Sequence, residues 1–308
     1  MRQIESILLT VCLLTIAACG NSEAGKKGVG ISSPMAAMKE LPMPIIPDSL
    51  TTSGERAAYA VCHYWDSMDF NDQAMATDSA LVEQSFSNFI TLLPHADETS
   101  RHRAVSILLN NAAAGSADGY NLIMSTAEHY LWNPESPYCS EELYLPFVDY
   151  AIARDKDDIV YADRRDVIMK NRPGSISPDF TVRDRNGDNI RLRNHDVGVT
   201  TLLMFYAPDC DRCHSAIEAL SADPAINNAI ANGTLRLLAV YIGDNTKAWT
   251  EHAATLPQSW QVAIDSQSTI DNDELYTIRA TPSFYLIDPS DTIIFKDAPL
   301  SRILTYIN

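Results

Sequence analysis

Basic residues are scarce in this sequence, and their scarcity restricts the possible partners. The 308 residues include 23 Lys and Arg against 40 Asp and Glu, which gives a formal net charge of −17 at pH 7. The phosphates of nucleic acids and anionic lipid headgroups repel a chain this negative. We therefore expect no nucleic-acid partner.

Long apolar runs, sequence repeats and clustered metal ligands are also lacking. After the N-terminus no segment reaches the roughly 20 apolar residues of a membrane-spanning helix, which excludes a multi-pass membrane protein. We find no convincing repeat with a period of about 20 to 50 residues. What remains is an ordinary share of hydrophobic residues, 46%, in a chain long enough for two domains.

Residues 1–18 have the pattern of a secretory signal peptide. Arg2 and the amino terminus supply positive charge, and the apolar stretch from Ile7 to Ala18 ends in small residues. The segment Thr15–Cys19 resembles a bacterial lipobox, which implies that Cys19 is acylated and becomes the first residue of the mature protein. The alternative is an ordinary cleaved signal followed by an unrelated cysteine.

A lipid anchor at Cys19 implies a protein that faces the periplasm from a membrane. Each buried methylene contributes about 0.8 kcal/mol, so several acyl chains together anchor a protein stably. Gly20 stands where an Asp would resemble an inner-membrane retention signal, which favours the outer membrane. Residues 19–47 are rich in Gly, Ser, Lys and Pro without periodicity, and we expect them to form a flexible tether.

Residues 48–172 carry helical patterns and predict an all-α domain. Ser53 is a candidate cap of the first helix, and Thr77 or Asp78 precedes the second. Ser140 is a candidate cap of the helix that begins after two prolines. Further helices are expected over 97–113, 118–132, 140–153 and 157–170. The stretches CHYWDSMDF, NPESPYCSEELYLPF and KNRPGSISPDF resemble a helical domain of unknown function that precedes thioredoxin-like domains in some Gram-negative lipoproteins.

Over residues 173–308 the sequence pattern changes to expected strands that alternate with helices, which predicts an α/β sheet. Asn186-Gly187 predicts a type I′ hairpin turn. A continuous apolar run from Val199 to Tyr206 is typical of a strand covered on both faces. Later strands are expected over 235–242, 260–264, 283–287 and 292–295, and helices over 212–231, 246–255 and 269–277.

The buried strand leads into Cys210-Asp211-Arg212-Cys213 at the start of a helix. Cysteines with this spacing lie close enough to form a disulfide, and a C-x-x-C between a strand and a helix is typical of redox chemistry. The unpaired N–H groups and the dipole of the helix N-terminus favour the thiolate of Cys210.

Together with Ser177-Pro178-Asp179-Phe180, the hairpin and Arg279–Phe284, this motif resembles the TlpA/ResA-like thiol-disulfide oxidoreductases of the thioredoxin superfamily. The resemblance implies a thioredoxin fold in which Cys210 attacks and Cys213 resolves. It also implies that Pro282 is cis beside the dithiol and that the Thr281 backbone meets an extended substrate. No organic cofactor is implied.

Three positions depart from the family pattern and alter the expected electrostatics. Asp209 replaces the usual Trp before the first cysteine, Met204 occupies a position that is often polar, and Ala216 replaces a Glu of some relatives. Asp209 and Asp211 oppose thiolate formation at Cys210, whereas Arg212 favours it.

Three alternatives to redox catalysis remain for the motif. Cys210–His214 also spells C-x-x-C-H, the attachment motif of c-type haem, but the preceding strand argues against a haem domain. Zinc bound through the two cysteines and a His lacks a second ligand pair, so we expect no metal. The third alternative is a structural disulfide on an inactive scaffold that only binds other proteins.

Cys62 and Cys139 are the other cysteines of the mature chain. In an oxidising compartment two leftover thiols favour a structural disulfide, and two buried thiols are the alternative.

The expected function is thiol–disulfide exchange on envelope proteins, with protein thiols and disulfides as partners. TlpA/ResA-like relatives mostly act as reductants, which implies electrons from a membrane donor of the DsbD type.

Overall fold

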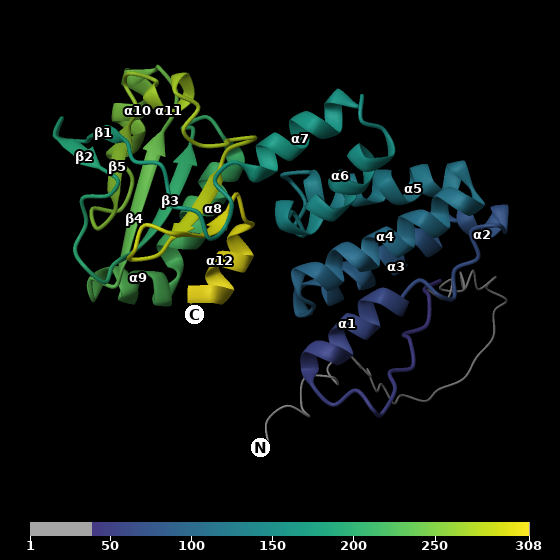
Figure 1. Cartoon of the computed structure of the whole chain (residues 1–308). Coiled ribbons are helices and arrows are strands. Elements are labelled where there is room, and N and C mark those ends of the chain that lie inside the picture. Colours follow the sequence, from purple (N-terminus) through teal and green to yellow (C-terminus); the bar gives the residue numbers. More distant parts are fainter. Residues whose placement is uncertain (1–38, 308) are drawn as a thin grey trace, which may run out of the picture. The chain divides into compact units, whose positions relative to one another are not determined.

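The computed structural model describes residues 39–307 (Figure 1). The predicted signal peptide (1–18), the predicted acylation site Cys19 and the expected tether as far as residue 38 lie outside the described residues. Between residues 39 and 307, no helix combines the length and the apolar character that crossing a membrane requires.

The first part of the described chain is helical, as the sequence predicts. Its elements are α1 (Ser53–His63), α2 (Gln73–Ala76), α3 (Ser79–Leu92), η1 (Leu93–His95), α4 (Glu98–Gly115), α5 (Ala117–Ala127), η2 (Glu128–Trp132), α6 (Glu141–Arg154) and α7 (Ile159–Met169). Capping side chains determine where several of these helices begin. The Thr52 hydroxyl caps α1 in a reciprocal capping box with Glu55, the Asp78 carboxylate caps α3, and the Ser140 hydroxyl caps α6.

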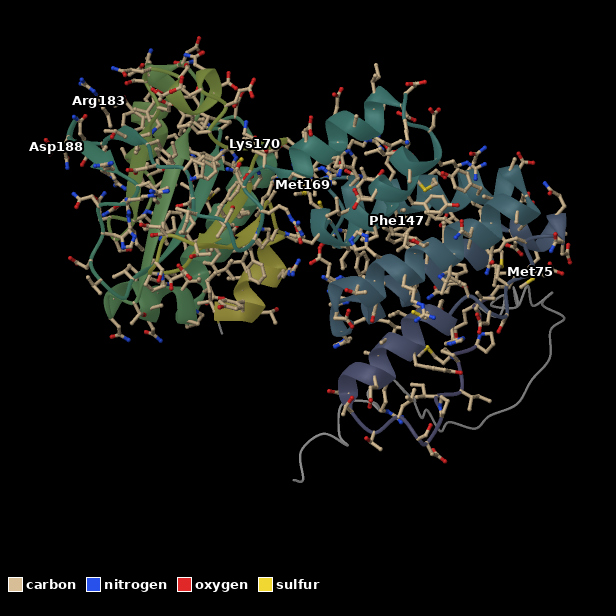
Figure 2. All side chains as sticks on the ribbon, in the orientation of Figure 1. Met75, Phe147, Met169, Lys170, Arg183 and Asp188 are labelled. Atoms are coloured by element: carbon tan, nitrogen blue, oxygen red, sulfur yellow. The ribbon has the colours of Figure 1, made fainter. Side chains whose placement is uncertain are left out.

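Aromatic side chains fill the core between these helices. Tyr64, Phe86, Phe89 and Phe147 are each at most 1% exposed, and Phe86 lies 5.8 Å from Phe147 between ring centroids. Figure 2 shows Phe147 among the packed side chains of this region. The end of α4 approaches the Phe70 backbone so closely that a Cβ at Gly115 would meet it at 2.6 Å.

The second part is a seven-stranded mixed sheet in the order β2-β1-β5-β4-β3-β6-β7. Its strands are β1 (Thr181–Asp184), β2 (Asn189–Arg191), β3 (Thr200–Tyr206), β4 (Leu235–Tyr241), β5 (Gln261–Ile264), β6 (Ser283–Ile287) and β7 (Ile293–Lys296). The central strands β3 and β4 run parallel and side by side, whereas β6 is antiparallel to β3 (Figure 1). This arrangement is consistent with a thioredoxin fold.

The central strand β3 is buried on both faces. Leu202, Met204 and Tyr206 face a core that is covered by α8 (Asp211–Ala222), α9 (Pro224–Ala231), α10 (Thr246–Ala253) and α12 (Leu300–Ile307). Leu203 and Phe205 face the opposite core, to which the short α11 (Thr269–Asn272) contributes Ile270. Because alternate residues of a strand point to opposite faces, the continuous apolar run follows directly from this double burial.

The hairpin at Asn186-Gly187 does not have the predicted type I′ turn, because that turn requires a positive φ at both central residues. Only Gly187 of the two has one, at 89°. The Asp184 carbonyl accepts the Gly187 N–H at 3.1 Å, and the Asp184 N–H donates to the Asp188 carbonyl at 2.8 Å. The loop is therefore three residues long. The Asp184 carboxylate stabilises it by accepting the N–H groups of Asn186 and Asp188.

Two helix predictions in this part need correction, and one helix was missed. The segment predicted as one helix from 212 to 231 is two, because Asp223 ends α8 and caps α9 while Pro224 occupies the first turn of α9. The helix predicted over 269–277 ends at Asn272. Helix α12 was not predicted at all.

A group of four buried charged side chains joins β7 and the loop before β6 to the start of α6. We call Glu141, Arg279, Lys296 and Asp297 the charge cluster; their side chains are 2 to 13% exposed. Glu141 lies 3.1 Å from Arg279 Nε and 2.7 Å from Lys296 Nζ, and Asp297 lies 3.1 Å from an Arg279 Nη. The Arg279 guanidinium also covers the Trp132 ring at 4.2 Å.

Candidate redox site

The two cysteines of the motif lie where β3 gives way to α8. Strand β3 ends at Tyr206, and Cys210 is the N-cap of α8. The Cys210 sulfur occupies the place of a capping oxygen, since it accepts the backbone N–H of Cys213 at 3.1 Å. The sequence predicted this position for Cys210, because a buried strand and a helix start are both local patterns.

The loop before β6 brings Thr281 and Pro282 to the same place. The Thr281–Pro282 peptide bond is cis, and Cys210 Sγ lies 3.3 Å from the Thr281 carbonyl oxygen. Strand β6 pairs with β3 in the register Phe205↔Ser283, so the residue before Ser283 necessarily lies near the end of β3. The four predicted site residues are thus gathered from segments about 70 positions apart.

The two sulfurs differ in exposure and in proton affinity. Burial by itself raises the pKa of Cys210, but hydrogen bonds to Cys213 and Thr281 and the charge of Arg212 outweigh it and leave the pKa below the ordinary value. Cys213 is fully buried, and burial raises its pKa to about 12. Cys210 is therefore the more acidic thiol of the pair, and Cys213 holds its proton more tightly.

A layer of rings lies beside the dithiol, and the sequence did not single it out. His252 lies 5.6 Å from both Tyr206 and His214 between ring centroids. Burial, and then the charge of His214, lower the pKa of His252, so its ring is neutral at pH 7. The Tyr206 hydroxyl and His252 Nδ1 are buried without a hydrogen-bond partner among the described residues.

Charges of both signs surround the entrance to Cys210. Asp209, Asp211 and Arg212 are all exposed. Arg212 lies 3.2 Å from a Glu135 carboxylate oxygen. Glu135 lies in the loop before α6, so the helical part contributes a charge to the site. Nothing in the local pattern around Glu135 indicates this role, because the contact joins residues 77 positions apart.

A groove of about 380 Å³ begins at Pro282. It is lined by Pro282 and Phe284, by Arg212 and Ala216 of α8, and by residues 134–137 of the loop before α6, among others. Most of its lining is apolar. An extended chain whose sulfur approached Cys210 would therefore find an apolar surface next to it.

Two family descriptions match the sequence. Residues 18–171 match a domain of unknown function, DUF5106. The chain belongs to the DUF5106 family. Residues 173–296 match the AhpC/TSA family. A helical domain of unknown function in front of a thioredoxin-like domain is what the resemblance predicted.

Solved structures from Bacteroides are similar to this chain. A thioredoxin-like protein from Bacteroides caccae is 26% identical with a TM-score of 0.75, over 87% of this chain and 97% of that one. A conserved protein of unknown function from Bacteroides fragilis is 35% identical over 44% of this chain and 98% of its own, with a TM-score of 0.43. A thiol-disulfide oxidoreductase from the same species is 20% identical over 44% of this chain and 100% of its own, with a TM-score of 0.38. No curated protein matches.

The disulfide predicted between Cys62 and Cys139 of the DUF5106 domain is absent, because both are free thiols with separate partners. Cys62 Sγ faces the Ser100 carbonyl at 3.9 Å, within the helical core. Cys139 Sγ accepts a hydrogen bond from an Arg279 Nη at 3.4 Å, next to the charge cluster. The alternative of two unpaired thiols packed in the interior therefore describes them better.

The c-type haem alternative does not fit the AhpC/TSA domain. Attachment would need both sulfurs at the surface, whereas Cys213 is fully buried on the inner face of α8. His214, the residue that would ligate the iron, donates its Nε2–H to the Pro208 carbonyl at 2.7 Å.

Proposed function

We propose that this protein is a thiol-disulfide oxidoreductase that acts on disulfides of envelope proteins. One observation carries the proposal: the Cys210 sulfur accepts the Cys213 N–H at a helix start and lies 3.3 Å from the carbonyl that precedes Pro282. A lowered thiol pKa, partial exposure and a second thiol three residues later are the properties that disulfide exchange needs.

The reaction consists of two exchanges in which sulfur–sulfur bonds form and break. The Cys210 thiolate attacks one substrate sulfur, a mixed disulfide forms, and the other substrate sulfur leaves as a thiolate that takes up a proton. Cys213 then loses its proton and attacks Cys210 Sγ, which releases the second substrate thiol. The substrate disulfide gains two electrons, and the Cys210–Cys213 pair is oxidised to a disulfide.

A reductant in an oxidising compartment needs a second dithiol to reduce Cys210–Cys213 again. We propose a membrane-bound dithiol donor: one of its thiolates would attack the half-buried Cys210 Sγ and release Cys213 as a thiolate that takes up a proton, and its second thiol would then release Cys210 and close the donor's own disulfide. The proposed compartment rests on the N-terminal sequence, in which a signal peptide precedes Cys19. Acylation of Cys19 would keep the protein on a membrane, preferably the outer one, facing the periplasm.

The chemistry is tested by reduction of insulin and of a small dye-labelled disulfide. Cys210→Ser should abolish both activities, and Cys213→Ser should stop after the first exchange and accumulate mixed disulfides at Cys210. Cys62→Ser is the matched control, because it removes a thiol outside the site and should leave both rates unchanged. If the wild-type protein turns over neither substrate in either redox direction, the protein is a binding scaffold instead.

The anchor is tested separately by fractionation of cells. Cys19→Ser should move the protein from the membrane fraction to a soluble one, while the redox activity per molecule stays the same. A wild-type protein that is soluble after cleavage of its signal peptide would contradict the anchor but not the chemistry.

A further inference from the structure

A second cavity, of about 450 Å³, lies at the end of the sheet opposite the dithiol. It is lined by the loop between β2 and β3, the turn between α9 and β4, and the starts of β4 and β5. Val199, directly before β3, lines it, whereas Cys210 follows the other end of that strand. The volume is within the range of small-molecule sites, about 300 to 1,000 Å³. Thiol exchange makes no use of this cavity.

The start of β4 has an open edge at the cavity. Strand β4 pairs with β3 from Leu235 onward, but with β5 only from Leu238 onward. The first three residues of β4, 235–237, therefore have no β5 partner, and all three line the cavity. An open strand edge presents backbone N–H and C=O groups that no neighbouring strand uses. The cavity thus has backbone donors available to a ligand.

A buried guanidinium without a counter-charge also lines the cavity. Arg236 is 8% exposed. It donates to the Gln261 side-chain carbonyl and to the Leu192 carbonyl, each at 2.6 Å, and lies 3.5 Å from the Arg191 carbonyl. All three acceptors are neutral. A guanidinium has five N–H groups, so two remain for a ligand.

The surroundings of Arg236 leave its charge uncompensated. No carboxylate between residues 39 and 307 pairs with this guanidinium, and burial alone lowers its pKa to about 10. A buried charge without a counter-charge is costly, and an anion that entered the cavity would remove part of this cost.

The other charged groups at the cavity limit the charge of the ligand. His195 is occupied, because its Nε2 lies 3.0 Å from an Asp291 carboxylate oxygen. Asp196 is exposed and lines the cavity, and the whole chain has a net charge of −17. Water screens Asp196, whereas the buried Arg236 acts at full strength, so one negative charge is favoured and a second is opposed. A carboxylate also matches the planar guanidinium fork.

We propose that this cavity binds a small organic monocarboxylate, whose carboxylate pairs with Arg236 and accepts backbone N–H groups at the open edge of β4. Asn194, Ser259 and Gln261 add amide and hydroxyl groups to the lining, which suit a hydroxyl group on the ligand. Glycolate and lactate should therefore bind more tightly than acetate. The inference is independent of the redox chemistry, because the cavity and Cys210 lie at opposite ends of β3.

The test measures binding to the full-length protein by isothermal titration calorimetry at constant ionic strength. The probes are sodium glycolate, lactate, acetate and phosphate, with sodium chloride as the reference for unspecific salt effects. We expect saturable binding of glycolate and lactate, weaker binding of acetate and the weakest binding of phosphate. A thermal melt should show the same order, because a ligand that binds the folded state raises the melting temperature.

Three variants locate the ligand. Arg236→Gln should weaken glycolate binding by about tenfold or more, the usual loss for a hydrogen-bonded charge. Asp196→Asn removes an exposed like charge and should tighten binding, by up to about fivefold. Arg183→Gln is the matched control, because it makes the same charge change as Arg236→Gln on the exposed face of β1, outside the cavity. It should bind glycolate as the wild type does.

Several results would overturn the inference. Absence of saturable carboxylate binding to the wild type would refute it, and so would equal binding to the wild type and Arg236→Gln. If Arg236→Gln does not fold, Asp196→Asn decides, because an unchanged affinity there would place the ligand elsewhere. Phosphate binding that exceeds glycolate binding would refute the assigned ligand class. None of these results alters the outcome of the insulin and dye-labelled disulfide assays.

Discussion

Replacement of Lys296 by Met should destabilise the protein strongly, because this lysine has two roles at once. Its ammonium group lies 2.7 Å from Glu141 in the charge cluster. It also donates to the carbonyls of Val167 and Lys170, each at 2.5 Å, and to that of Ile168 at 3.4 Å. These carbonyls belong to the end of α7, where the helix itself provides no donors. The lysine of β7 therefore caps the last helix of the DUF5106 domain.

The expected loss of stability follows from the burial of the Lys296–Glu141 ion pair. The Lys296 and Glu141 side chains are 2% and 5% exposed, and removal of one partner from a buried ion pair costs about 3 to 5 kcal/mol. Arg279 remains 3.1 Å from Glu141 and compensates part of the lost charge, so we expect the lower end, about 3 kcal/mol. Neither Glu141 oxygen has a hydrogen bond of good geometry, so attraction between charges alone holds it.

The loss of stability in Lys296→Met should depend on pH, and the pKa of Glu141 determines whether it grows or shrinks as the pH rises. Burial raises that pKa above 4.5, and the charges of Lys296 and Arg279 oppose the rise. A carboxyl group with a raised native pKa stabilises the fold below its unfolded pKa, and this stability is lost as the pH rises through the native value. Without Lys296 the native pKa rises further, so the variant should lose more stability at about pH 7.5 than at about pH 5.

Urea unfolding, followed by tryptophan fluorescence and circular dichroism, measures the effect at both pH values. The double variant Lys296→Met/Glu141→Gln should recover part of the loss, with a coupling of about 1 to 3 kcal/mol. Lys247→Met is the matched control, because Lys247 is 86% exposed and should change stability by less than about 0.5 kcal/mol. Strictly additive single variants, or a penalty that does not grow with pH, would refute this account of the charge cluster.

Three further outcomes are expected. Alkylation of Cys210 should rise with pH to a midpoint below 9.0, the ordinary thiol value, and a midpoint at or above it would contradict the hydrogen bonding described here. His252 has a native pKa below 6.5, caused by burial and then by a neighbouring histidine, so stability should fall as the pH drops below 6.5. His252→Phe should flatten this part of the pH profile of unfolding. Gly115→Ala should cost about 1 to 3 kcal/mol, because its Cβ would meet the Phe70 backbone at 2.6 Å. Gly54→Ala has open space and should be neutral or stabilising by up to about 1 kcal/mol in the same thermal melt.

Features that depend on neighbouring residues were predictable from the sequence. The expected strand 283–287 matches β6 at both ends, and Ser140 caps α6 as expected. Cys210 stands at the helix start because the apolar run of β3 and the polar start of α8 are both visible locally. Local patterns also predicted the helical domain and the α/β sheet, whereas the thioredoxin fold was predicted from the resemblance to the TlpA/ResA-like oxidoreductases.

Features that depend on distant contacts were missed or wrong. The predicted pairing of Cys62 with Cys139 rested on compartment and counting, whereas packing gives each thiol its own partner. The Asn186-Gly187 dipeptide fits two hairpin types, and the Asp184 carboxylate favours the longer loop. The amphipathic helix α12 was missed although Pro299, a helix-start signal, directly precedes its first residue, Leu300.

The charge cluster explains how a domain without catalytic side chains bears on the chemistry of its neighbour. Arg279 comes two residues before Thr281, donates to the Trp132 carbonyl and lies 3.1 Å from Glu141. After Pro282, Ser283 donates to Asp297 at 2.8 Å, and Asp297 pairs again with Arg279. The loop that faces Cys210 is thus held on both sides by buried charges, one of them from the DUF5106 domain. Buried ion pairs contribute little net stability but are costly to break. We therefore expect the cluster to restrict the positions that Thr281 and Pro282 adopt beside the dithiol.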